Sequence, residues 1–201
     1  MKALALFRAG ALSPLTVACL IGPAVSGCGD PRMEWNEQVR LQNGDVIVIA
    51  RTAAFRENWI AGGGGGSFNR GMTLQIVQSA KPDNPGPWSA RFVPIILDRD
   101  PQTQEWFVVA TFFHCDSWYE LGRPKLPYTE YHYREGRWIQ QPLTEKLIGR
   151  TTNVLPADLS DKSAIAEYRP VLTVERKEQI LNNPAISPKF KHVVGNWTTG
   201  C

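Results

Sequence analysis

Acidic and aromatic side chains gather between residues 116 and 138, a combination that suits chemistry on sugars. Two carboxylates placed on either side of a glycosidic bond can cleave it. The acids are Asp116, Glu120 and Glu130, and the rings among them are Trp118, Tyr119, Tyr128, Tyr131, Tyr133 and Trp138. The same pattern also fits a core, with the rings packed as cross-strand pairs and the acids at its rim. A noncatalytic binding face therefore ranks above an enzyme, and we assign no catalytic residue.

Histidine and cysteine residues, which are common metal ligands, stand near these acids. His114, Cys115 and Asp116 are consecutive, and His132 lies on an expected hairpin nearby. Their spacing matches no zinc motif. Nucleophilic catalysis by a Cys-His pair would require a free thiolate, which an oxidised Cys115 lacks. The sequence therefore predicts neither a metal ion nor another cofactor.

The most specific motif of the chain ends an apolar stretch near the N-terminus. Lys2 and Arg8 precede the mostly apolar residues 9–25, which is the pattern of an export signal. The residues Val25, Ser26, Gly27 and Cys28 resemble the lipobox of bacterial lipoproteins, in which an aliphatic and two small residues precede the cysteine. This resemblance implies that Cys28 carries acyl chains and that the signal is removed just before it. The alternative is an ordinary secretory signal cut after Ser26.

Lipidation of Cys28 would divide the chain and determine its location. We expect a signal peptide over residues 1–27, a lipidated tether over 28–34 and a single mainly β domain over 35–201. Two or three acyl chains would make membrane anchoring permanent. Gly29 stands where, in that family, an Asp favours retention in the inner membrane. We therefore expect the periplasmic side of the outer membrane, with the inner membrane as the alternative because Asp30 is one place later.

Two cysteines, Cys115 and Cys201, remain besides the lipidated Cys28 after removal of the signal, since Cys19 lies within the apolar stretch. In an oxidising periplasm they can form one disulfide. The alternative is a buried thiol together with a free terminal thiol.

Length and charge restrict the classes of protein that fit. The chain has 201 residues, of which 43% are hydrophobic and 20% charged, enough for one domain with a core. The formal net charge is +3, and removing residues 1–27 takes away Lys2 and Arg8 but no acid, leaving +1. Nucleic-acid binding requires a strongly basic surface, so we exclude it.

Alternating apolar residues and turn signals predict the strands that must position these groups. Residues 35–41 and 46–49 flank Asn43-Gly44, the strongest short hairpin signal. Residues 52–61 show no clear period, and the five glycines of 62–66 predict a mobile loop. Further strands are expected at 73–78, 91–97 and 106–113, a second hairpin at 128–134 and 137–141, and a helix at 175–182. The expected fold is mainly β, an antiparallel meander forming a sandwich or partly closed barrel, with a short C-terminal helix.

The segment from Trp106 to Asn153 resembles a family of bacterial lipoproteins that has no established function. The residues that carry the resemblance are Phe107-Val-Val-Ala-Thr-Phe-Phe113, the segment from Cys115 to Pro124, Pro127-Tyr128 and Gly136-Arg-Trp138. The Trp35-x-Glu37 start and the terminal Cys201 fit the same family. The resemblance implies localisation at the membrane and no particular activity.

The function expected from the sequence is binding of a protein or glycan component of the envelope by a lipid-anchored domain. Two alternatives stay open, a glycan-active hydrolase and a passive structural lipoprotein. A deep cleft with paired acids would favour the hydrolase.

Overall fold

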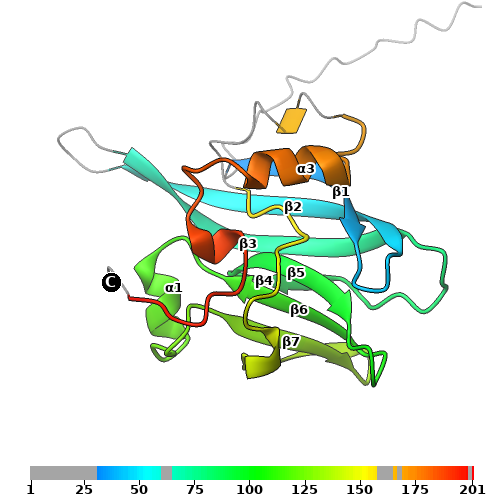
Figure 1. Ribbon diagram of the computed structural model, residues 1–201. Helices are drawn as coiled ribbons and strands as arrows, with labels where there is room; N and C mark the ends of the chain where they lie inside the picture. The colour runs from blue at the N-terminus through cyan, green and yellow to red at the C-terminus, as the bar shows by residue number, and fades with distance from the viewer. Residues whose placement is uncertain (1–30, 60–64, 158–164, 167–168, 199–200) are drawn as a thin grey trace, which may run out of the picture.

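The computed structural model describes residues 31–59, 65–157, 165–166, 169–198 and 201, and it is mainly β (Figure 1). Two separate antiparallel sheets have four strands each. The first sheet, in spatial order, contains β1 (Arg32–Arg40), β2 (Val46–Trp59), β3 (Gly65–Gln78) and β4 (Trp88–Ala90). The second contains β5 (Val93–Arg99), β6 (Trp106–Thr111), β7 (Thr129–Arg134) and β8 (Arg137–Pro142). The predicted mainly β fold is thus confirmed as two sheets that do not close into a barrel.

The main core lies between the two sheets. Side chains alternate along a strand, so β1 turns Met33, Trp35 and Val39 to the same side. These residues belong to one buried cluster with Val108 of β6 and Tyr131 of β7. The shared cluster explains why the two sheets stack.

A second, smaller core covers the other face of the second sheet. Phe107 and Val109 of β6 pack there with Leu147 and Val193 from the C-terminal part of the chain. Every residue of β5 and β6 is consequently buried. These two strands are covered on both faces, which explains the nearly continuous apolar runs at residues 93–97 and 106–110.

The two predicted hairpins are confirmed by their turns. β1 pairs with β2 across Gly44, which has φ +91°. β7 pairs with β8 across Glu135 and Gly136, with φ values of +50° and +77°. In the second turn both central residues have positive φ, which is the two-residue geometry that matches strand twist. In the longer first turn only Gly44 has positive φ, which glycine adopts without strain.

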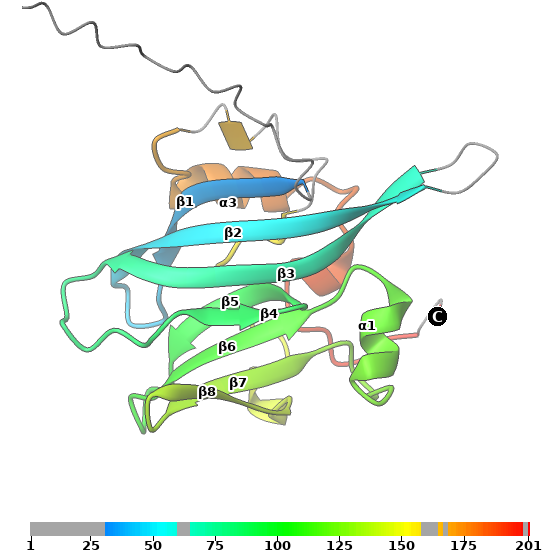
Figure 2. The same cartoon turned by 180° about the vertical axis from the view of Figure 1, so that it is seen from behind.

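The hairpin of β2 and β3 is longer than the sequence predicts, and its end projects past the second sheet (Figure 2). β2 continues to Trp59 through the stretch where no period was seen, because a register shift between Ala54 and Phe55 interrupts the alternation. Gly65 begins β3, so the glycine run is partly strand, and residues 60–64 lie outside the described residues. At the other end, β1 begins at Arg32, inside the stretch assigned to the tether.

The described part of the C-terminal half also contains the α-helices α1 and α3, the 3-10 helices η1 (Glu145–Leu147) and η3 (Pro188–Phe190), and a disulfide. α3 (Val174–Leu181) confirms the predicted helix, and its first turn is capped by Thr173, whose side chain accepts from Arg176 N at 3.3 Å. α1 (Cys115–Glu120) was not predicted, because six residues are too few to show a helical period. The Cys115–Cys201 disulfide is present, with the two Cα atoms 5.5 Å apart.

Candidate functional site

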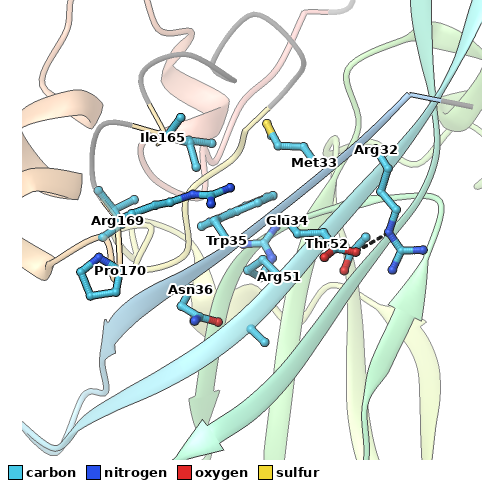
Figure 3. Close-up of a pocket in the computed structure, with 13 residues that line it drawn as sticks. Arg32, Met33, Glu34, Trp35, Asn36, Arg51, Thr52, Ile165, Arg169 and Pro170 are labelled. Carbon is cyan, nitrogen blue, oxygen red and sulfur yellow. Dashed lines mark ion pairs between the residues drawn. The ribbon is translucent and has the colours of Figure 1, made fainter.

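A cavity of about 780 Å³ follows the outer edge of strand β1 (Figure 3). Five consecutive β1 residues, 32–36, line it. Because neighbouring side chains of a strand point to opposite faces, consecutive lining residues mean that the cavity runs along the strand edge. Ala50, Arg51 and Thr52 of β2 also contribute, and the opposite wall is formed by Ile165, Ala166, Arg169, Pro170 and Leu172. We call this cavity the β1-edge pocket.

The pocket exists because a fifth strand starts beside β1 and then stops. Leu172 N donates to Asn36 O at 2.9 Å, and Gln38 N donates to Leu172 O at 2.8 Å, which is a parallel bridge. Two residues earlier stands Pro170, which has no N–H and cannot extend the ladder. The chain leaves the edge at this point, and the pocket occupies the place of the missing strand.

Two buried donors in the pocket wall have no hydrogen-bond partner among the described residues. They are Nε1 of Trp35 and Nε of Arg51, whose residues are 9% and 1% exposed. The Arg51 guanidinium lies 4.8 Å from the centroid of the Trp35 ring, so the two donors belong to one packed unit. A buried donor without an acceptor costs roughly 1–3 kcal/mol, which makes this pair an exception to the usual saturation of buried polar groups.

Arg51 is held by a buried ionic cluster that we call the Glu37 cluster, formed by Glu37, Arg51 and Lys177. Arg51 Nη1 lies 2.6 Å from Glu37 Oε1, and Lys177 Nζ of α3 lies 3.1 Å from Glu37 Oε2. Leu155 N also donates to Glu37 Oε2, at 2.9 Å. The carboxylate therefore joins β1, β2, α3 and the segment around Leu155 behind the pocket.

The charges around the pocket favour an anion. Burial lowers the pKa of Arg51 and of Lys177 from their usual values, and the Glu37 carboxylate opposes this effect at both groups. Two cations facing one carboxylate leave the Glu37 cluster with one uncompensated positive charge when all three are ionised. Arg169 adds a cation, and its side chain reaches across the pocket toward Trp35 (Figure 3). Arg32, by contrast, is paired with Glu34 at 2.7 Å.

The structure separates Glu130 from Asp116 and Glu120, the other two acids on which a sugar-cleaving site would depend. Asp116 and Glu120 lie on α1, where Asp116 lines a cavity of about 490 Å³ and Glu120 pairs with Arg91. Glu130 lies on β7, 1% exposed, and lines a different cavity of about 370 Å³. The expectation that the acids stand at the rim of the core is therefore wrong for Glu130. This residue is buried on the side of the second sheet that the smaller core covers.

The aromatic rings of the same stretch form core, as one of the two interpretations predicts. Tyr131, Tyr133 and Trp138 pack in or against the core between the sheets. Tyr128 is buried in the second core, and Trp118 packs edge-on to Trp197 with centroids 5.9 Å apart. Tyr119, 46% exposed, is the ring of this group that faces solvent most.

Asp100 shares the cavity of Glu130, and hydrogen bonds occupy both carboxylates. Asp100 accepts from the backbone N–H groups of Gln102 and Thr103 at 2.9 and 3.1 Å. Its hydrogen bond with Lys146 is the main cause that lowers the pKa of Asp100 to about 2. An acid with this pKa is ionised at neutral pH and cannot serve as a proton donor there. Asp100 is therefore not suited to be the general acid that glycoside cleavage needs.

The residues considered for a metal site are dispersed or already bonded. Cys115 is in the disulfide, and His114 lies beside Asp116 in the cavity near α1. His132 lies on β7, with Nε2 2.6 Å from Glu130 Oε1 and Nδ1 3.3 Å from Glu105 Oε2. Across the described part of the chain, no group of three or more His, Cys, Asp or Glu side chains is placed to hold a metal ion.

The proposed anchor residues Val25, Ser26, Gly27 and Cys28 lie outside the described residues. Within the described ranges, no helix combines the length and the apolar character needed to cross a bilayer.

The residues of the β1-edge pocket were not singled out from the sequence, although a signal for them exists. Glu37 and Arg51 stand at positions where the alternation of β1 and β2 turns side chains into the core. A charged residue at such a position is buried only with a partner, so two of opposite sign on adjacent strands indicate a buried pair. Arg169 carries no comparable signal, because it follows a stretch without periodicity.

Comparisons of this chain with models of protein families, with curated proteins and with solved structures give no match.

Proposed function

We propose that this chain is a lipoprotein of the bacterial cell envelope whose β domain binds an envelope component in the β1-edge pocket. In this proposal acyl chains on Cys28 anchor the protein to the periplasmic side of the outer membrane. The lipobox-like residues Val25 to Cys28 and the resemblance to a lipoprotein family support the anchor. The component bound is a protein or glycan segment of the envelope.

The observation that supports binding at this place is the pair of buried donors at Trp35 and Arg51. Folding buries both N–H groups without giving them an acceptor among the described residues. Their energetic cost is recovered if an acceptor enters the adjoining cavity. A volume of about 780 Å³ is within the range of sites that hold small molecules or short peptide segments.

The proposed anchor would keep this pocket close to the membrane. Arg32, which lines the pocket, is four residues after Cys28. Four extended residues span at most about 14 Å. Ligands close to the bilayer can therefore reach the pocket. This position suits a receptor for envelope components better than a receptor for soluble metabolites.

The experiment that tests the binding function is photo-crosslinking in intact cells that produce the full chain. A photoreactive residue replaces Glu34 in the pocket, and a matched variant carries it at Gln75, an exposed residue of β3 in the same sheet. We expect an adduct of defined mass at position 34 that is at least fivefold more abundant than any adduct at position 75. Equal labelling at both positions, or no adduct at position 34, would contradict binding in this pocket.

A further inference from the structure

The free edge of β1 is built to accept another strand. Asn36 O and Gln38 N face the edge, because both bond to Leu172. With the two-residue period of a strand, Glu34 turns its N–H and C=O to the same edge, and Asn36 adds its N–H. Within the described residues, no backbone hydrogen bond reaches these groups of Glu34 and Asn36. An edge with alternating donors and acceptors is complementary to an extended peptide.

The donors inside the pocket select for charge at one place along such a peptide. Trp35 Nε1 and Arg51 Nε can only donate, so they require an acceptor. Arg169 and, when all three of its groups are ionised, the Glu37 cluster stabilise an acceptor that is negatively charged. A carboxylate meets both requirements, and charged acceptors form the stronger hydrogen bonds.

We propose that the β1-edge pocket binds the C-terminal end of an extended peptide, which pairs with Arg32–Asn36 as a fifth strand and places its carboxylate at Trp35 Nε1 and Arg51 Nε. The proposal rests on the proposed function and names the ligand class for the same site. Five residues of β1 span roughly 14 Å at about 3.4 Å per residue, which matches a tetrapeptide. A phosphate group is the less complementary ligand, because it offers only acceptors to an edge that also presents carbonyl groups.

The test measures binding of peptides to the purified full chain in detergent micelles. The probes are a pool of N-acetylated tetrapeptides with a free carboxylate and the same pool as C-terminal amides. Titration calorimetry measures their affinity for the parent chain and for each variant, and the ¹⁵N indole signal of Trp35 reports contact with the pocket in the parent chain. We expect the carboxylate pool to shift this signal and to bind at least tenfold more tightly than the amide pool. Trp35→Phe keeps an aromatic ring but removes the N–H, and we expect it to weaken binding about tenfold, the usual effect of losing one charge-assisted hydrogen bond.

Trp88→Phe is the matched control. Trp88 Nε1 is likewise buried without a partner among the described residues, but Trp88 does not line the pocket. We expect this variant to lose a similar amount of stability and to change peptide affinity by less than twofold. If both variants weaken binding equally, the effect is one of folding and the proposal is overturned.

Two further probes distinguish a peptide ligand from a free phosphate and from a lipid headgroup. Inorganic phosphate alone and vesicles containing an anionic phospholipid are added to the same samples. Binding of either with the same dependence on Trp35, without binding of the peptides, would overturn the peptide proposal in favour of a phosphate site. Equal affinity for carboxylate and amide pools, or no response to any probe, would also overturn it. A crosslinked adduct at position 34 in cells would in each case leave the proposed binding function standing.

Discussion

At the scale of single residues, Glu37 is the buried counter-charge that fixes Arg51 in the wall of the candidate site. Its side chain is 0% exposed, and it faces the buried cations of Arg51 and Lys177. Removal of one member of a buried ionic group leaves the other charges without compensation, which is far more costly than loss of a surface pair. The Glu37 carboxylate therefore allows an arginine to sit in the wall of the pocket.

We predict that Glu37→Gln lowers the free energy of unfolding by about 3–5 kcal/mol, because two buried cations then lack a counter-charge. Urea unfolding at neutral pH, followed by tryptophan fluorescence, measures the change. Glu178→Gln is the control, since Glu178 pairs with Arg40 at 3.4 Å on the exposed surface and should cost less than about 1 kcal/mol. Equal losses in the two variants would show that the Glu37 cluster does not stabilise the fold.

The sequence alone predicts the disulfide but not the β1-edge pocket. The pairing of Cys115 with Cys201 could be predicted, because only these two cysteines follow the expected lipid-bearing Cys28. The pocket could not, because its buried donors arise where β1, β2 and the chain around Arg169 meet. Contacts between segments more than a hundred residues apart leave no local pattern in a single sequence.

At the scale of elements, the C-terminal segment is tied to α1. The disulfide joins Cys115, the first residue of α1, to Cys201, and Tyr119 Oη donates to Cys201 O at 3.2 Å. Trp197 packs edge-on against Phe112, with ring centroids 5.5 Å apart. Covalent and aromatic contacts thus act together where a chain end would otherwise fray.

We predict that the double variant Cys115→Ser, Cys201→Ser loses about 2–4 kcal/mol of unfolding free energy, because the disulfide closes a loop across a sequence separation of 86. The urea midpoint of the oxidised protein and of the variant gives the difference. Reductant should lower the midpoint of the parent protein and leave that of the variant unchanged. A variant whose urea midpoint equals that of the oxidised parent protein would contradict this prediction.

Elements with strong local signals were predictable and those shaped by irregular pairing were not. Asn43-Gly44 and Glu135-Gly136 located two hairpins because their turns need positive φ. The far half of β2 was missed because the register shift at Ala54 breaks the alternation. The interrupted strand at Leu172 pairs in parallel with distant β1, and such a pairing has no local signature.

At the scale of the whole molecule, the proposed anchor and the candidate site lie at the same end of strand β1. The proposed lipid at Cys28 lies four residues before the strand whose edge forms the pocket, so membrane attachment and ligand binding share one end of β1. A sandwich of two sheets holds that edge rigidly, because β1 packs through Trp35 and Val39 into the core. The geometry suits a receptor that meets its ligand near the membrane surface.

Incorporation of labelled palmitate into the full chain in bacterial cells is the most direct test of the proposed lipoprotein. We predict labelling of the parent chain and of Cys19→Ala, whose cysteine would leave with the signal, and complete loss of label in Cys28→Ala. Label that persists in Cys28→Ala, or a parent chain that takes up none, would contradict the account.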